Sequence, residues 1–515
     1  MSNLPVTWWL CCALLVVLSA LAVVPSYVNH DAAWYLYMAR RVMDGAVMYR
    51  DVVDTNPPLI VWLTIVPAWL ARFALSDVIL FKLFVYAIAF AALGACAQLA
   101  GRIWPDWRPG LRGLLVATTV FVALPFPKTD FGQREHFVLL MTLPYVFASA
   151  AWLRGFNASR TSAAVIGVVG GLGFAVKPHY LLGWLAVELA LLFVRRPAWR
   201  RPQAVAAACA ICLYGATVLL VVPQYLALAQ VVAAVYGGIN ASAAVMLRVP
   251  DVQFWAICLV LLAVVRLPER SRWTCLVLFA AATGLLAGGL LQLKAWSYHL
   301  LPGRAFMLLF LATMSLSALE ALPSVVSAIR GGARGVAWAG GILLLLWSGR
   351  YVAEARRPAA ADLVTPLAQL VRAQAPGGRL ALLSMRTMVY PAFPLVNYTG
   401  AEWALRHNSL WFLPGLYDRQ LQVEEEGSPG RAPGAMSPVE RRFFEEIVGD
   451  LCAAPPDLLI IEAPLDRAPA GWRALDLNAY YGRAQRYRRL LTSYAPLTTV
   501  AQFVVFKRTA PASCR

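Results

Sequence analysis

A succession of long apolar segments separated by short polar loops most constrains what this chain can fold into. A helix needs about 20 apolar residues to cross a bilayer, and several segments reach or approach that length. The chain of 515 residues is 60% hydrophobic and only 14% charged, which is too apolar for a soluble protein. The sequence therefore predicts a polytopic α-helical membrane protein.

The apolar segments predict about eleven transmembrane helices. The first covers about residues 6–24 and is expected to stay in the protein as a helix, not to be removed as a signal peptide. No basic cluster precedes it, and its one small-residue triplet of the cleavage type lies inside the apolar run. The others are expected near residues 78–100, 114–124, 137–153, 163–176, 181–194, 204–222, 252–265, 274–291, 305–322 and 336–347.

The distribution of Arg and Lys predicts the orientation of these helices. Loops on one side carry clusters of arginine, such as the segment 195–201, and the opposite loops are poorer in cations, as expected for cytoplasmic and outer loops. The apolar run 58–75 would reverse every later loop if it crossed the membrane, so we expect it to stay on the outer side. The net charge of +18 comes from these loops and does not indicate a nucleic-acid partner.

Two domains are expected. Residues 1–349 form the transmembrane domain, with surface helices in a first outer loop at 26–77. Residues 350–515 form a soluble α/β domain on the outer face, because short β-rich runs alternate with helical stretches there. The β-rich runs are Leu380–Leu383, Leu458–Ile461 and Phe503–Phe506; the clearest helix, Val439–Leu451, follows a capping-box pattern at Ser437–Glu440, and Gly427–Pro433 is typical of a loop.

The cysteines predict one disulfide and no zinc site. Seven of the nine cysteines fall in the apolar segments and have the character of packing residues. Cys452 and Cys514 are the two in the outer domain, where the compartment favours oxidation, so we predict that they pair.

An acidic stretch follows the first span. Asp31 precedes a run whose apolar residues recur at helical spacing, which predicts an amphipathic helix lying on the membrane. Asp31 is therefore either the N-cap of that helix or a carboxylate rigidly placed for chemistry, and the residues themselves leave both roles open.

Basic and aromatic residues recur in the outer loops. The segments 128–136, 177–180 and 294–304 are rich in Lys, His, Tyr and Arg, and the histidines at 30, 136, 179 and 299 all fall on the outer face. Each histidine alone is typical of an ordinary interfacial residue. Together with the acids of the first two loops, these residues predict a cleft at the bilayer surface with a basic side suited to phosphate.

The order of these features resembles the C-type (GT-C) glycosyltransferases, with the protein O-mannosyltransferases and the lipid A aminoarabinose transferase as the nearest branch. The resemblance covers about residues 6–304. It rests on an acid after the first span, a Pro-Pro-Leu element at 57–59, a second acid entering the fourth span and a lysine after the fifth. It departs from the family pattern at His30 and Asn56, where a second acid and a lysine are frequent.

The resemblance implies roles for individual residues. Asp31 takes the place of the catalytic base, and Glu135 that of the second-loop acid, with Asp130 as its rival. Lys177 matches the lysine after a Gly-Leu-Gly helix at 171–173. The residues implied in binding the donor phosphate or the substrate are Lys177, His179, Lys294, Tyr298, His299, Arg304, His30 and His136.

The implied activity is inverting transfer of a sugar from a polyprenyl-phosphate donor to a hydroxyl of a lipid, glycan or protein. The resemblance leaves open whether a divalent metal ion takes part. It implies an integral protein of the bacterial inner membrane whose active site and C-terminal domain face the periplasm. The alternative is a transporter or flippase for a lipid-linked sugar, which would need ionisable groups near mid-membrane, where Glu188 is the one clear acid.

Overall fold

The computed structural model describes residues 4–73, 76–195, 198–321, 327–356, 362–385, 389–416, 436–463 and 475–514. Two compact units are formed. The first, which we call the bundle unit, consists of Met1–Asn29, Ile79–Val218 and Ala241–Arg357. The second, the sheet unit, consists of His30–Val78, Leu219–Asn240 and Pro358–Arg515. The first outer loop thus shares a compact unit with the C-terminal part, whereas the predicted domain boundary at residue 350 stays a prediction.

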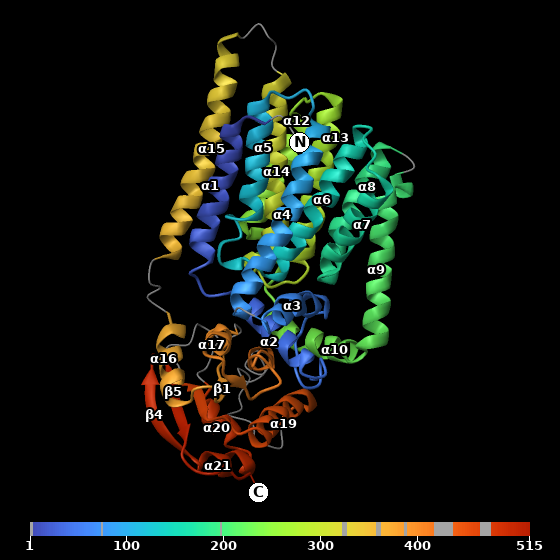
Figure 1. Cartoon of the computed structure of the whole chain (residues 1–515). Helices are drawn as coiled ribbons and strands as arrows, with labels where there is room; N and C mark the ends of the chain where they lie inside the picture. The colour runs from blue at the N-terminus through green and yellow to red at the C-terminus, as the bar shows by residue number, and fades with distance from the viewer. Residues whose placement is uncertain are drawn as a thin grey trace. The chain divides into compact units, whose positions relative to one another are not determined.

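The bundle unit is made of helices that run along a common direction (Figure 1). Its helices are α1 (Val6–Val23), α4 (Asp77–Ile103), α5 (Pro109–Ala123), α6 (Arg134–Leu153), α7 (Arg160–Ala175), α8 (Leu181–Val194), α9 (Pro202–Val221), α11 (Ala243–Arg248), α12 (Pro250–Val264), α13 (Glu269–Leu290), α14 (Leu301–Ala321) and α15 (Ser327–Ala355). Short 3-10 turns, η1 (Lys128–Asp130), η2 (Pro178–Tyr180), η3 (Ala198–Arg200) and η5 (Ser297–Leu300), connect some of them.

Seven helices in the described part of the chain are long and apolar enough to cross a membrane, and the chain is an integral membrane protein. These are α1, α4, α6, α9, α13, α14 with its preceding turn, and α15. The shorter apolar helices α5, α7, α8 and α12 lie where four further spans are predicted. The mostly helical class is confirmed, and the number of eleven spans stays a prediction.

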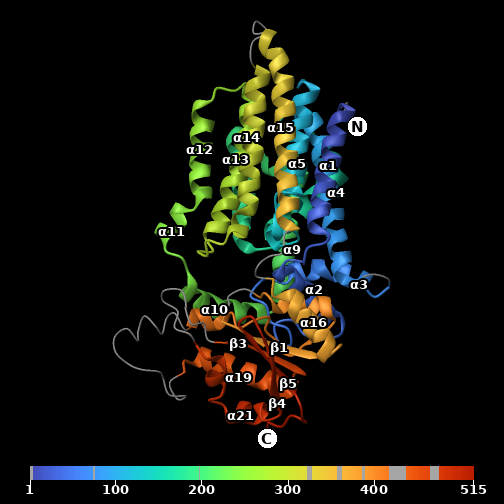
Figure 2. The ribbon, with the colours of Figure 1, turned by 90° about the vertical axis from the view of Figure 1, so that its left-hand side faces the viewer.

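The sheet unit contains one five-stranded sheet with helices on both sides (Figure 2). The strands are β1 (Arg379–Leu383), β2 (Glu402–Trp403), β3 (Leu458–Glu462), β4 (Tyr494–Val500) and β5 (Phe503–Arg508), in the order β2-β1-β3-β5-β4. The strand β1 pairs in parallel with β2 and β3, and β5 pairs antiparallel with β3 and β4. The three predicted β-rich runs are therefore confirmed as β1, β3 and β5.

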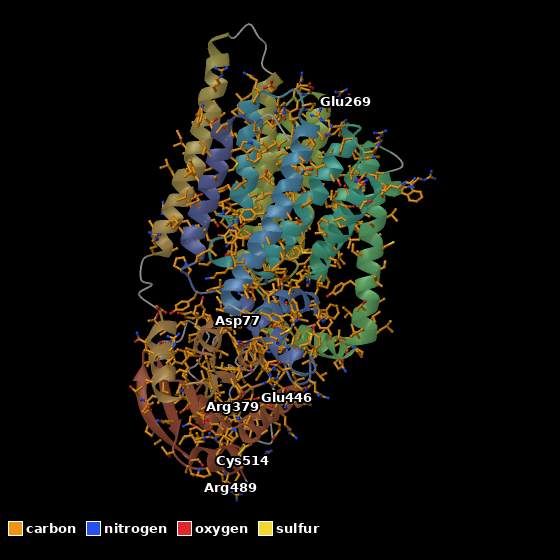
Figure 3. The ribbon with its side chains drawn as sticks, in the orientation of Figure 1. Asp77, Glu269, Arg379, Glu446, Arg489 and Cys514 are labelled. Carbon is orange, nitrogen blue, oxygen red and sulfur yellow. A yellow bond between two sulfur atoms is a disulfide. The ribbon has the colours of Figure 1, made fainter. Side chains whose placement is uncertain are left out.

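Helices cover the sheet because its central strands are apolar on both faces. Every residue of β3 is buried, as expected for a strand between two helical layers. The covering helices are α16 (Val364–Gln374), α17 (Ala392–Thr399), α19 (Pro438–Ala453), α20 (Leu477–Tyr481) and α21 (Gln485–Leu491). Figure 2 shows α16 on one side and α19 with α21 on the other, and Figure 3 marks Arg379 at the start of β1 and Glu446 on α19.

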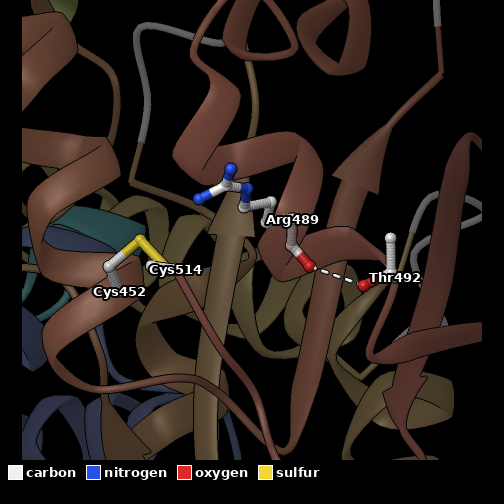
Figure 4. Close-up of a disulfide and its surroundings, with 4 residues drawn as sticks. All are labelled: Cys452, Arg489, Thr492 and Cys514. Atoms are coloured by element: carbon white, nitrogen blue, oxygen red, sulfur yellow. Dashed lines mark hydrogen bonds between the residues drawn. A yellow bond between two sulfur atoms is a disulfide. The ribbon is translucent and has the colours of Figure 1, made fainter.

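Two local predictions in this unit are confirmed. The Ser437 hydroxyl accepts a hydrogen bond from the Glu440 backbone N–H at 3.1 Å, which caps α19. Cys452 on α19 and Cys514 form a disulfide (Figure 4). The predicted loop Gly427–Pro433 lies outside the described residues.

The rest of the sheet unit comes from the first outer loop and from residues 219–240. The loop forms α2 (His30–Met43) and α3 (Leu59–Leu70), and the other segment forms α10 (Gln224–Tyr236) and the turn η4 (Gly237–Ile239). The helix α3 has 12 residues and contains Pro67, so it is shorter than a membrane span.

Candidate active site

The first candidate residues lie at the start of α2 in the sheet unit. His30 and Asp31 are its first two residues, so Asp31 stands inside the first helical turn. The N-cap role considered for Asp31 stays a prediction, because helix ends are defined only to within one or two residues. Its carboxylate Oδ1 lies 3.6 Å from His30 Nε2, and the two side chains are 14% and 19% exposed. A carboxylate in a first turn is stabilised by the helix dipole, which favours its ionised form.

The helix α2 is buried more widely than its predicted apolar stripe. All residues from Ala32 to Ala39 are buried, including Trp34 and Tyr37, which lie off that stripe. The C-terminal part of the sheet unit covers this second side: Trp34 and Tyr37 contact the ring of Phe393 with centroids 5.0 and 5.5 Å apart. The Tyr37 hydroxyl accepts from the Trp403 backbone N–H at 3.1 Å.

Polar contacts fix the same helix in position. The Trp34 indole N–H donates to Asp54 Oδ2 at 2.9 Å, and the Asn397 amide donates to the Ala33 carbonyl at 3.1 Å. The backbone of Val53 pairs with that of the 406–407 segment, where Val53 N donates to the Arg406 carbonyl at 2.8 Å. Because α2 is held from both sides, the Asp31 carboxylate sits on a rigid element.

The second group of candidate residues forms a buried charged cluster in the bundle unit. We call Arg134, Glu135, Lys177 and His299 the Glu135 cluster. The Lys177 ammonium lies 3.4 Å from Glu135 Oε1 and 3.3 Å from His299 Nε2. His299 Nε2 lies 3.9 Å from the same carboxylate oxygen, and Arg134 Nε lies 3.9 Å from the other one. Glu135 has no exposed surface.

The cluster carries more positive than negative charge. Arg134 and Lys177 face a single carboxylate, and Lys294 and His179 also lie within electrostatic range of His299. Glu135 Oε2 and His299 Nδ1 are buried without a hydrogen-bond partner among the described residues. A buried site with surplus cations and an unused imidazole nitrogen is suited to an anionic ligand.

Two neighbouring glycines allow this cluster to form. A Cβ atom at Gly288 would lie 2.5 Å from the His179 carbonyl oxygen, and one at Gly289 would lie 2.4 Å from that of His299. Both contacts are shorter than any side chain permits, so α13 can approach the turns η2 and η5 only with glycine at these positions. The Tyr180 hydroxyl adds a hydrogen bond to the His299 carbonyl at 2.8 Å, which joins the two turns.

Lys294 lies in a strained part of the backbone. Its neighbours Leu293 and Ala295 have φ of 53° and 52°, in the left-handed region that non-glycine residues rarely adopt. Such strain concentrates at functional sites. Lys294 is largely buried, and this burial lowers the pKa of its ammonium to about 8, so that it titrates near the upper end of the physiological range.

Not all predicted residues join the cluster. Arg304 forms a bidentate ion pair with Asp251 at 2.6 and 2.9 Å, which neutralises its charge. His136 accepts from the Gly132 backbone N–H through Nδ1 at 3.0 Å, and its Nε2 lies 2.7 Å from the Ala123 carbonyl. Both ring nitrogens thus bind backbone, so His136 holds the loop before α6. The His179 side chain is exposed, and the Tyr298 ring packs edge-on against His299 at 4.4 Å.

The sequence prediction left two residues out of the site, the cluster member Arg134 and its neighbour Gln133. Arg134 begins α6, and Gln133 precedes it as the N-cap. Both amide atoms of Gln133 are buried without a hydrogen-bond partner in the described part of the chain. The sequence could have indicated both residues, because they adjoin Glu135 at the polar N-terminal end of an apolar helix. Asp130, the rival of Glu135, lies in η1 and is not part of the cluster.

Glu188, the acid predicted to lie near mid-membrane, has a structural partner. Both Glu188 oxygens accept hydrogen bonds from the Arg201 guanidinium, at 2.6 and 2.7 Å, and Oε1 also accepts from the Tyr145 hydroxyl at 2.5 Å. A carboxylate bound in this way is neutralised. The residue that a transporter mechanism would have used therefore carries a fixed ion pair.

Within the described residues, no three His, Cys, Asp or Glu side chains gather in a way that could hold a metal ion.

Comparison with solved structures identifies the fold. The chain is similar to the crystal structure of ArnT from Cupriavidus metallidurans bound to undecaprenyl phosphate, with a TM-score of 0.58 and 13% identity over 97% of this chain and 97% of that chain. The apo crystal structure of the same protein gives a TM-score of 0.57 and 13% identity, covering 96% and 95%. The chain has the GT-C glycosyltransferase fold. No protein-family model and no curated protein matches the sequence.

The likeness to ArnT confirms the fold expected from the order of outer-loop residues. It extends over nearly the whole of both chains, so it includes the C-terminal part, which the sequence resemblance did not reach. At 13% identity the comparison concerns the fold, and the roles of individual residues rest on the contacts described above.

Proposed function

We propose that this protein is a membrane glycosyltransferase that moves a sugar from a polyprenyl-phosphate donor to an acceptor hydroxyl, with inversion at the anomeric carbon. The Glu135 cluster is the observation that carries the proposal. A buried group of cations around one carboxylate suits a phosphate monoester, and the fold is shared with a protein crystallised with undecaprenyl phosphate. The active site and the sheet unit face the periplasm in this proposal.

Asp31 acts as the general base. Its carboxylate takes the proton of the acceptor hydroxyl while the acceptor oxygen bonds to the anomeric carbon. The bond from that carbon to the phosphate oxygen breaks on the opposite face, so the configuration inverts. A base on the rigid helix α2 keeps the orientation that proton transfer requires.

The cationic residues of the bundle unit stabilise the leaving group. The polyprenyl phosphate departs with the electron pair of the broken bond, and Lys177, Arg134 and Lys294 offset its growing negative charge. Glu135 holds Lys177 in place between the carboxylate and His299. No general acid is needed, because a phosphate leaves readily as an anion.

A deletion strain provides a direct test, because its envelope retains both the unused donor and the unmodified acceptor. Membranes of that strain, incubated with the purified protein, should lose one polyprenyl-phosphate sugar and gain one product heavier by the mass of that sugar. Mass spectrometry of both fractions would also name the sugar and the class of acceptor. A transporter would leave all covalent masses unchanged, and that result would overturn the proposal.

A matched pair of lysine variants tests the role of the cluster. Lys177→Gln should strongly weaken binding of undecaprenyl phosphate, whereas Lys128→Gln should not, because Lys128 contacts the Trp347 ring and Glu354 instead. Isothermal titration with the purified protein measures both. Equal loss of binding in the two variants would show that surface charge, and not the cluster, binds the phosphate.

A further inference from the structure

A cavity with polar and apolar walls lies in the bundle unit, outside the residues assigned above. Its volume is about 670 Å³, and it is lined by the C-terminal turns of α4, the first turn of α5 and the N-terminal half of α7. These helix ends meet at one end of the bundle unit (Figure 1). By the loop charges, this end is the one predicted to face the cytoplasm.

Two arginines line the cavity. The Arg102 guanidinium is exposed and stands 5.1 Å from the centroid of the Phe156 ring. Arg112 is only 9% exposed, and its Nε has no hydrogen-bond partner among the described residues. A buried guanidinium N–H without an acceptor is costly unless a ligand supplies one. No Asp or Glu is among the described residues that line the cavity, so the missing acceptor is expected to come from outside the chain.

The N-terminus of α7 points to the same chemistry. Ser159 is the N-cap of this 16-residue helix, and its hydroxyl accepts from the Ser162 backbone N–H at 3.2 Å. Both serines line the cavity. The first turn of a helix offers N–H donors and a partial positive charge to an anion, in addition to the two arginines.

The deeper wall of the cavity is apolar. Leu99 lies about one turn before Arg102 on α4, and Ile166 lies about one turn after Ser162 on α7. The helix α4 is long and apolar enough to cross the membrane, and Arg102 lies in its last turn, so the arginines are expected at the membrane edge with the apolar residues on the side of the hydrocarbon. A ligand that fits both parts has an anionic head and an apolar tail.

We propose that this cavity binds the phosphate headgroup of an anionic phospholipid between Arg102, Arg112 and the α7 N-terminus, with an acyl chain along Leu99 and Ile166. The volume of about 670 Å³ suits a headgroup and the first part of a chain. The site is separate from the proposed donor site, so its test does not depend on transferase activity.

Native mass spectrometry of the purified protein in detergent measures lipid binding directly. Phosphatidylglycerol should bind more tightly than phosphatidylcholine with the same acyl chains, because its headgroup has a net negative charge. The double variant Arg102→Gln/Arg112→Gln should weaken phosphatidylglycerol binding about thirtyfold. Each cation near the membrane surface contributes about 1 kcal/mol to the binding of an anionic lipid, and the variant loses two of them. The control Arg266→Gln/Arg272→Gln removes two exposed arginines from the α12–α13 region and should leave the affinity unchanged.

Two further arms separate the possible outcomes. If Arg112→Gln does not fold, Arg102→Gln alone should still weaken binding about fivefold, since Arg102 is exposed and tolerates substitution. Inorganic phosphate at millimolar concentration should not displace phosphatidylglycerol, because it lacks the apolar tail. Equal affinity of wild type and both arginine variants, or displacement by phosphate alone, would overturn the lipid assignment.

Discussion

The substitution Asp31→Asn separates a catalytic role from a structural one. The amide keeps the shape and most of the hydrogen-bonding capacity of the carboxylate but cannot accept a proton at neutral pH. If Asp31 is the base, transfer should fall by about 100-fold or more, which corresponds to about 2.7 kcal/mol of activation free energy. Binding of polyprenyl phosphate should stay unchanged, since the phosphate is bound by the cationic cluster of the bundle unit.

The structural cost of the same change is smaller. A negative charge in the first turn of a helix contributes about 0.3–1 kcal/mol to stability. The contact with His30, at 3.6 Å, is too long for a hydrogen bond. Because Asn keeps the shape and most of the hydrogen-bonding capacity of Asp, the protein should stay folded while its turnover drops.

The assay follows the release of polyprenyl phosphate by the purified protein, together with its thermal unfolding midpoint. Asp44→Asn is the matched control, because Asp44 follows the same helix and forms an exposed ion pair with Arg72 at 2.6 Å, which contributes little to stability. A near wild-type rate for Asp31→Asn would refute the assignment of the base. An equal loss of rate in Asp31→Asn and Asp44→Asn would point to a general effect of loop charge instead.

Four further outcomes are expected. Lys177→Gln should lower kcat/KM for the donor by about 100-fold, from the loss of one charge-assisted contact to the leaving phosphate; initial-rate kinetics at limiting donor measure it. Because burial lowers the pKa of Lys294 to about 8, kcat/KM for the donor should be constant below that pH and fall as the pH rises above it, and Lys294→Arg should remove this fall. Glu188→Gln should destabilise the protein by about 3–5 kcal/mol, since it leaves its buried arginine partner unpaired; denaturation in mixed micelles measures this loss, and unchanged stability would contradict the fixed ion pair. Replacing Cys452 and Cys514 by serine should lower the thermal unfolding midpoint of the sheet unit. The disulfide joins residues 62 positions apart, and closing a loop of that length adds about 4 kcal/mol to the free energy of unfolding. Turnover at low temperature should not change.

Local patterns in the sequence determined most of the secondary structure. The apolar segments became the helices of the bundle unit, because a run of apolar residues has one stable form in a bilayer. The three β-rich runs became β1, β3 and β5, and Ser437 caps α19 as its position before Glu440 indicated. Each of these features depends on neighbours within a few residues, which a single sequence displays directly.

The cluster of the bundle unit was only partly visible in the sequence. Glu135, Lys177 and His299 stood out as polar residues at the ends of apolar helices. Lys177 is 42 residues from Glu135 and 122 residues from His299 in the sequence. Separations of this size do not indicate which side chains meet. Arg304 had the same appearance in the sequence, but Asp251 binds it, because α12 and α14 pack together.

The environment of Asp31 was decided by the tertiary structure alone. The sequence of α2 predicted a helix with one buried face, since the stripe of apolar residues at helical spacing covers one side. The other side is buried too, by residues such as Trp403, which is 366 positions from Tyr37. A periodic pattern marks one face of a helix that packs against its neighbours, but it does not show whether a second face is buried or which distant segment covers it. The sequence by itself therefore determined that a carboxylate stands at the start of a helix after the first span. Only the tertiary structure decided that the C-terminal part of the sheet unit packs on this helix.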